Sequence, residues 1–131
     1  AELLTDYGHE DTLWGMTLAQ AGFSIRHIDN PVQHEGLETA EVFLHKTEQA
    51  LQNLHRLVAA GVPQQQLAAH VRVYAWGMKA QNRGISGLLG QFYRAFGKAM
   101  RWQLQGKRPS LRLFALYKLA YLCATWPRQA P

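Results

Sequence analysis

Cysteine is almost missing from this chain of 131 residues, which contains only Cys123. A single thiol excludes an intrachain disulfide and a cysteine-based zinc site, and it agrees with a reducing compartment. Long apolar runs are also lacking, because Arg112 and Lys118 interrupt the last stretch that could span a membrane. The sequence opens without the charged leader and apolar run of a secretory signal. We therefore expect a cytoplasmic protein, either free or at the inner face of the membrane.

Acidic residues are absent from the second half of the chain. All nine Asp and Glu residues lie within residues 1–60, whereas eleven Lys and Arg residues and no acid follow from Arg72 onward. The net charge is +5, and the apolar fraction of 47% is that of a folded protein. This asymmetry predicts an anionic neighbour for the second half, which could be a membrane surface, a nucleic acid or the acidic first part. A merely solvated basic face is the alternative.

The first part of the chain predicts one helix followed by two extended pieces. Residues 9–21 have apolar side chains at helical spacing, with Trp14 and Leu18 on one face, and Gly22 is a typical stop. Residues 23–28 alternate between apolar and polar at first, which favours a half-buried strand. The turn signal at residues 29–31 and a second extended piece at residues 32–34 then predict a short β-hairpin-like pair.

The remainder of the chain predicts helices. Thr39 can cap a long helix whose buried stripe consists of apolar residues at helical spacing, and residues 61–63 end it. That stripe is Val42, Phe43, Ala50, Leu51, Leu54, Leu57 and Val58. Three further helices are expected at about residues 65–81, 86–105 and 110–125, with a break near residues 82–84. The expected class is thus an α+β fragment, predominantly α-helical.

Two segments carry candidate chemistry. Glu10 and Asp11 follow Gly8 and His9 at the start of the first expected helix, where the positive end of the helix favours ionised carboxylates. Such a carboxylate can act as a general base, although simple capping of the helix by acids would explain it as well. The second candidate is His34, which follows a turn and could present a neutral imidazole to a metal ion or be a hydrogen-bonded structural residue.

Together the two segments resemble the downstream motifs of family 2 glycosyltransferases, which have the GT-A fold. The matching stretches are YGHEDTLWG at residues 7–15, HIDNPVQHEGLET at residues 27–39 and FLHKTE at residues 43–48. The resemblance covers about residues 1–57. It implies that residues 1–60 are the acceptor-side end of a GT-A α/β domain, completed by an upstream nucleotide-binding half. Residues 61–131 would form a helical, basic C-terminal extension.

The resemblance also implies roles for individual residues. Asp11 would be the base that deprotonates the acceptor hydroxyl, and Glu10 would contact the acceptor. His9 occupies the second glycine position of the aromatic-Gly-Gly pattern found in part of the family, so an acceptor contact of its own is open. His34 would bind magnesium or manganese, whose main carboxylate ligands are expected upstream. The implied partners are a nucleotide-sugar donor and a saccharide or lipid-linked acceptor.

Two other functions are compatible with the sequence. A small basic helical module could bind nucleic acid or an anionic membrane through residues 72–128, with arginines on phosphates and aromatic side chains as anchors. A catalytically inactive glycosyltransferase relative could act as a scaffold. We favour the enzyme, with peripheral membrane contact through the basic C-terminal helices and without a nucleic-acid partner. The 131 residues alone are then expected to transfer no sugar.

Overall fold

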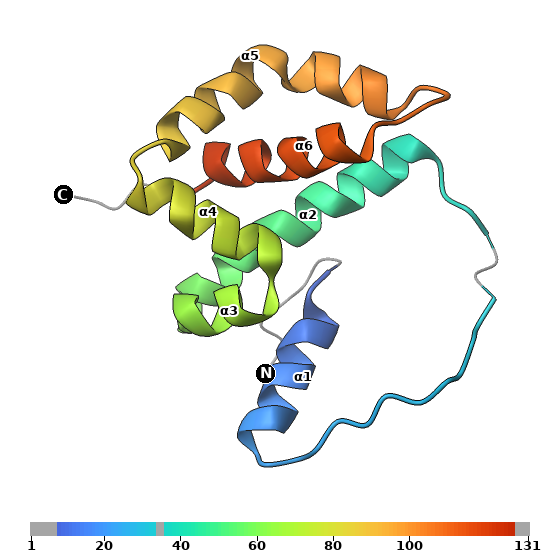
Figure 1. Cartoon of the computed structure of the whole chain (residues 1–131), viewed down its shortest axis with the longest axis vertical. Helices are drawn as coiled ribbons and strands as arrows, with labels where there is room; N and C mark the ends of the chain where they lie inside the picture. The colour runs from blue at the N-terminus through green and yellow to red at the C-terminus, as the bar shows by residue number, and fades with distance from the viewer. Residues whose placement is uncertain (1–7, 34–35, 128–131) are drawn as a thin grey trace.

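The computed structural model describes residues 8–33 and 36–127, and these residues form helices joined by turns and one long extended segment. In chain order the helices are α1 Glu10–Gln20, α2 Ala40–Ala59, α3 Gln64–His70, α4 Arg72–Asn82, α5 Ser86–Leu104 and α6 Leu111–Ala124. Figure 1 shows α6 between α5 and α2. Helix α4 lies across one end of α5 and α6, and α3 lies beneath α4. Helix α1 lies apart from this group, on the side of α3.

The core forms where α6 is covered by its neighbours. Tyr117, Ala120 and Leu122 of α6 are fully buried, because α2, α4 and α5 pack around this helix. One buried cluster joins α1, α2, α3, α4 and α6, with Met16, Leu54 and Leu67 among its members. A second cluster joins α2, α5 and α6. Helix α2 therefore shares its core with the helices that follow, while the expected division of the chain at residue 60 stays a prediction.

A polar contact also ties the three long helices together. Glu48 of α2 accepts a hydrogen bond from the buried Tyr117 hydroxyl of α6, and Arg101 of α5 donates to the same carboxylate at 2.5 Å. Burial and the bond to Glu48 raise the pKa of Tyr117, so its hydroxyl keeps the proton that it donates. This arrangement pairs an acid of α2 with a cation of the basic α5 and satisfies a carboxylate that is largely withdrawn from water.

The expected α+β class is wrong, because no strand occurs within residues 8–33 and 36–127. Residues 23–33 are extended but unpaired, and Phe23, Ile28 and Val32 are 65%, 73% and 83% exposed. Alternation predicted a half-buried strand, but a strand also needs a neighbouring backbone to receive its N–H and C=O groups. The second piece of the expected pair reaches His34, which lies outside the described residues.

The helix predictions succeed with one further correction. Thr39 caps α2 as expected, since its side chain accepts a hydrogen bond from the Val42 N–H. The single helix expected at about residues 65–81 is instead two, α3 and α4, separated at Val71, whose backbone is extended with φ −120° and ψ 100°. Val71 itself is buried in the first cluster, so the break inserts an apolar side chain between the helices.

Exposure also corrects two expected apolar faces. In α2, Leu51, Leu54 and Leu57 are buried as expected, but Val42 and Phe43 are 43% and 52% exposed. In α1 the buried residue is Met16, whereas Trp14 is 69% exposed. Among the residues that the structure describes, none of the helices has the length and apolar character that crossing a bilayer requires.

Candidate functional site

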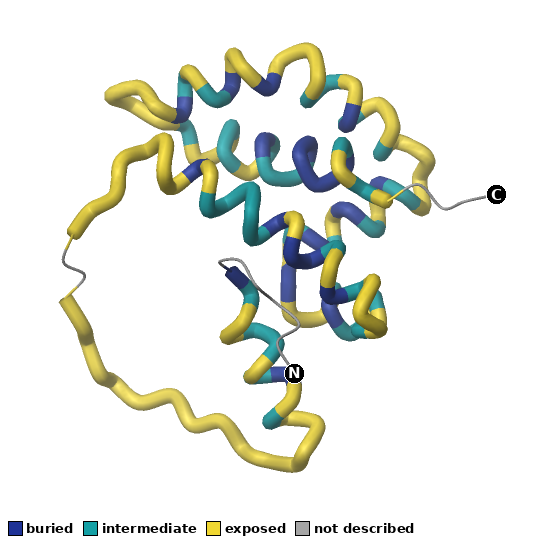
Figure 2. Tube along the Cα trace, turned by 180° about the vertical axis from the view of Figure 1, so that it is seen from behind, coloured by how far each residue is buried: buried dark blue, intermediate teal, exposed yellow. Residues whose placement is uncertain are grey.

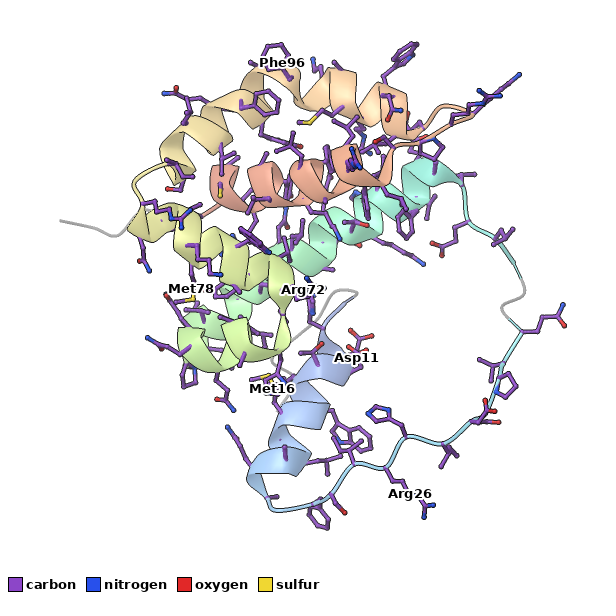
Figure 3. The ribbon with its side chains drawn as sticks, in the orientation of Figure 1. Asp11, Met16, Arg26, Arg72, Met78 and Phe96 are labelled. Carbon is purple, nitrogen blue, oxygen red and sulfur yellow. The ribbon has the colours of Figure 1, made fainter. Side chains whose placement is uncertain are left out.

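Asp11 lies in the first turn of α1, as the sequence predicted. Its carboxylate is exposed, and Oδ1 accepts a hydrogen bond from the Thr12 N–H at 2.7 Å. Figure 3 shows Asp11 at the upper end of α1, where the helix begins. Unpaired N–H groups and the positive end of the helix dipole favour an acid at this place, and the exposed Asp11 carboxylate is open to a ligand.

Glu10 is committed to the backbone that precedes the helix. Its Oε2 accepts a hydrogen bond from the Gly8 N–H at 2.8 Å, which fixes the side chain across the start of α1. The other carboxylate oxygen is the one that could contact an acceptor hydroxyl. Glu10 and Asp11 are both exposed but differ in their hydrogen bonds, since Glu10 accepts from the Gly8 N–H before the helix and Asp11 from the Thr12 N–H within it.

Helix α2 holds this loop in place. Gly8 is buried with φ 108°, and a Cβ there would lie 2.5 Å from the Cβ of Ala50. The Gly8 carbonyl accepts a hydrogen bond from the Nδ2 of Asn53 at 3.1 Å, and Asn53 in turn accepts one from Arg56 at 3.0 Å. Because Asn53 is fully buried, this polar link between the loop and α2 is shielded from water.

His9 is the residue with the most unusual backbone at the site. It has φ 69° and ψ 7°, in the left-handed region that few side chains adopt, and its Nδ1 lies 3.4 Å from the Thr12 hydroxyl. Burial lowers the pKa of His9, although the charges of Asp11 and Glu10 act in the opposite direction. The imidazole is therefore neutral at physiological pH and can accept or donate one hydrogen bond.

A shallow hollow opens beside His9. Its volume is about 300 Å³, and its lining combines apolar side chains with two lysines. Lys46 pairs with Glu38, and the Lys118 ammonium lies 4.6 Å from the centre of the Phe114 ring. Asp11 does not line the hollow. A ligand that contacts both His9 and Asp11 would therefore have to bridge from the hollow to the exposed start of α1.

The described residues do not form a metal site. Within residues 8–33 and 36–127, no group of three or more His, Cys, Asp or Glu side chains is placed to hold a metal ion. His34, the predicted ligand, lies outside the described residues, so its role stays a prediction. No step proposed below uses a magnesium or manganese ion bound by the described residues.

Sequence reasoning missed the residues of α2 that position the site. Ala50 and Asn53 are three residues apart and so share a face of α2, but nothing in their local sequence marks that face as the support of Gly8. The contact joins residues separated by 45 positions. The one available signal was Asn53 itself, because a polar side chain within an otherwise apolar stripe needs a hydrogen-bond partner when it is buried.

Comparison with known proteins gives no relative. A scan of protein-family models finds no match to this chain, and neither the curated proteins nor the solved structures contain a match. Function is therefore argued from the site itself.

Proposed function

We propose that this chain is the acceptor-side part of an inverting glycosyltransferase, with Asp11 as its general base. The observation that carries the proposal is the exposed Asp11 carboxylate in the first turn of α1, on a loop held by α2. The resemblance of residues 7–15, 27–39 and 43–48 to family 2 glycosyltransferases supports it. The donor is then a nucleotide sugar, and the acceptor is a saccharide or a lipid-linked saccharide.

The proposed step is a direct displacement at the anomeric carbon. Asp11 takes the proton from the acceptor hydroxyl as its oxygen attacks the sugar, and the nucleoside diphosphate leaves from the opposite face. The configuration at that carbon is inverted. A fixed loop matters for this step, because a base is effective only when it is held within hydrogen-bond distance of the proton that it removes.

Glu10 and His9 would bind and orient the acceptor. Glu10 has one oxygen committed to Gly8 and another that can accept a hydrogen bond from an acceptor hydroxyl. A neutral His9 can contact a second hydroxyl without placing a positive charge beside the base. The resemblance further implies magnesium or manganese, with main ligands in an upstream nucleotide-binding half and with His34 as a further ligand.

The test is transfer by the enzyme that includes the upstream half. Asp11→Asn is expected to lower kcat by about 10²- to 10⁴-fold, the usual contribution of a general base, with the Kd for the donor unchanged. Asp29→Asn is the matched control, because Asp29 is an equally exposed acid in the extended segment. Full transfer by Asp11→Asn would contradict the assigned role, and equal loss in both variants would indicate a general charge effect. Transfer by the 131-residue chain alone would contradict the need for an upstream half.

A further inference from the structure

Helix α5 carries apolar side chains on the side that faces away from the protein. Its inward face buries Gly90, Met100 and Leu104 against α6 and the second core cluster. On the opposite side, Leu88 and Trp102 are 69% and 79% exposed. Figure 2 shows α5 at the rim of the molecule, with much of its outer side exposed.

The exposed apolar residues line up along one side of the helix, with the exposed Gln91 at the edge of this stripe between Leu88 and Ala95. Leu88, Ala95, Ala99 and Trp102 recur at helical spacing and are all exposed, so they lie along the same side of α5. Phe96, which is 53% exposed, extends the stripe at its edge and contacts the ring of Phe92. Figure 3 shows the Phe96 ring beyond the outer surface of α5, pointing away from α6. An apolar stripe of this kind on the outside of a protein is a typical interaction surface.

Basic residues flank this stripe without any acid nearby in the sequence. Arg94 and Lys98 are exposed on the neighbouring side of α5, and Lys107 and Arg108 follow in the turn after the helix. Arg108 and Trp102 line the same shallow hollow at this end of the molecule. Since the last acid of the chain is Glu48, helices α5 and α6 and the turn between them carry positive charge only.

We propose that the outer face of α5 binds an anionic lipid bilayer. An apolar stripe with a tryptophan, flanked by arginine and lysine, is the pattern of a helix that lies in the plane of a membrane interface. Leu88, Phe96 and Trp102 would enter the boundary between headgroups and acyl chains. Arg94, Lys98, Lys107 and Arg108 would pair with lipid phosphates.

The arrangement of the stripe favours a membrane over a nucleic acid. A nucleic-acid site places arginine and lysine along the centre of the contact, since phosphates dominate the affinity. Here the stripe contains no cation, because Leu88, Ala95, Ala99 and Trp102 occupy it, and Arg94 and Lys98 stand beside it. This inference rests on α5 and its flanking turn, so it holds or fails independently of the glycosyltransferase proposal.

The first measurement is co-sedimentation of the 131-residue chain with vesicles. Binding is expected to vesicles of phosphatidylcholine mixed with phosphatidylglycerol, to weaken as salt is added, and to be much lower with phosphatidylcholine alone. Replacing Arg94 and Lys98 by glutamine should lower the affinity by about 30-fold, because each cation near an anionic surface contributes about fivefold. The double variant Lys79→Gln, Arg83→Gln, with Lys79 on α4 and Arg83 directly after it, is the matched control and should bind as the unaltered chain does. Absence of binding, or equal loss in both double variants, would overturn the proposal.

The second measurement locates the inserted face. Lipids brominated on their acyl chains should quench part of the tryptophan fluorescence, and Trp102→Phe should remove that part. Trp76→Phe is the control, because Trp76 is 55% exposed on α4, outside the proposed face. Quenching that survives Trp102→Phe would place insertion elsewhere and overturn the proposal. Equally tight, salt-sensitive binding of single-stranded DNA that is unaffected by Trp102→Ala would do the same. Circular dichroism of each variant is the check that its helices are retained.

Discussion

Gly8 is the residue on which the geometry of the candidate site depends most directly. A side chain there would face two penalties, since φ is 108° and a Cβ would lie 2.5 Å from the Cβ of Ala50. Gly8→Ala should therefore lower the free energy of unfolding by about 1–3 kcal/mol, the usual cost of backbone strain or overpacking. Chemical denaturation measures the change, and amide exchange in α1 shows whether the loop has moved.

The same position offers a rescue that separates the two penalties. Ala50→Gly removes the Cβ that Gly8→Ala would meet at 2.5 Å but leaves the Ala50 Cα at 2.9 Å, so the double variant should recover only a part of the loss due to crowding. Gly22→Ala is the matched control, because Gly22 also has a positive φ of 81° but no atom within 4 Å of a new Cβ. If Ala50→Gly restores nothing beyond the sum of the single changes, contact with the Ala50 Cβ is not the cause, and backbone strain or the Ala50 Cα accounts for the loss.

Helix α5 allows packing and helix propensity to be compared within one element. A Cβ at Gly90 would lie 3.2 Å from the Cα of Ala124, because α5 faces backbone atoms of α6 there. A Cβ at Gly87 would meet nothing within 4 Å. Gly87→Ala should stabilise the protein by up to about 1 kcal/mol through propensity alone, whereas Gly90→Ala should destabilise it. Thermal unfolding of both variants decides this, and stabilisation by Gly90→Ala would show that the helices can move apart freely.

The elements also show what sequence patterns can predict. Helix α2 followed from Thr39 and from leucines at helical spacing, both of which act within a few residues. The break at Val71 did not follow, because it depends on Val71 entering a core built from distant helices. The hairpin failed for a related reason. Alternating residues specify an extended backbone, but only a neighbouring strand turns residues 23–33 into part of a sheet.

At the scale of the whole molecule, the sequence predicts where the acids of the candidate site lie but not which residues support them. The position of Glu10 and Asp11 at a helix start was visible in the sequence, because the positive end of a helix and adjacent acids are local features. The support from Ala50 and Asn53 was not, since it arises from the docking of the loop on α2 across 45 residues. The metal-binding role of His34 stays a prediction, because His34 lies outside the described residues.

Stability of the whole molecule should depend on pH through two half-buried histidines in different places. His55 of α2 lies 3.3 Å from the Leu122 carbonyl and packs edge-on against the Trp126 ring. Burial lowers its pKa below the model-peptide value of 6.5, although the bond to Leu122 acts against this. Burial lowers the pKa of His9 in the same way. Both imidazoles are therefore neutral in the folded protein at pH values where the unfolded chain already binds protons.

The sign of the effect follows from proton counting. Below about pH 6.5 the unfolded state binds more protons than the folded state, so the free energy of unfolding rises with pH in this range. The contribution of the two histidines to the free energy of unfolding is complete above about pH 6.5 and is lost as the pH falls through their lowered pKa values. Urea unfolding between about pH 7.5 and pH 5.5 should show this loss. His55→Gln should flatten the curve because glutamine does not titrate, and His27→Gln in the exposed segment is the control that should leave it unchanged. A curve of unaltered slope for His55→Gln would mean that His55 does not couple folding to protonation.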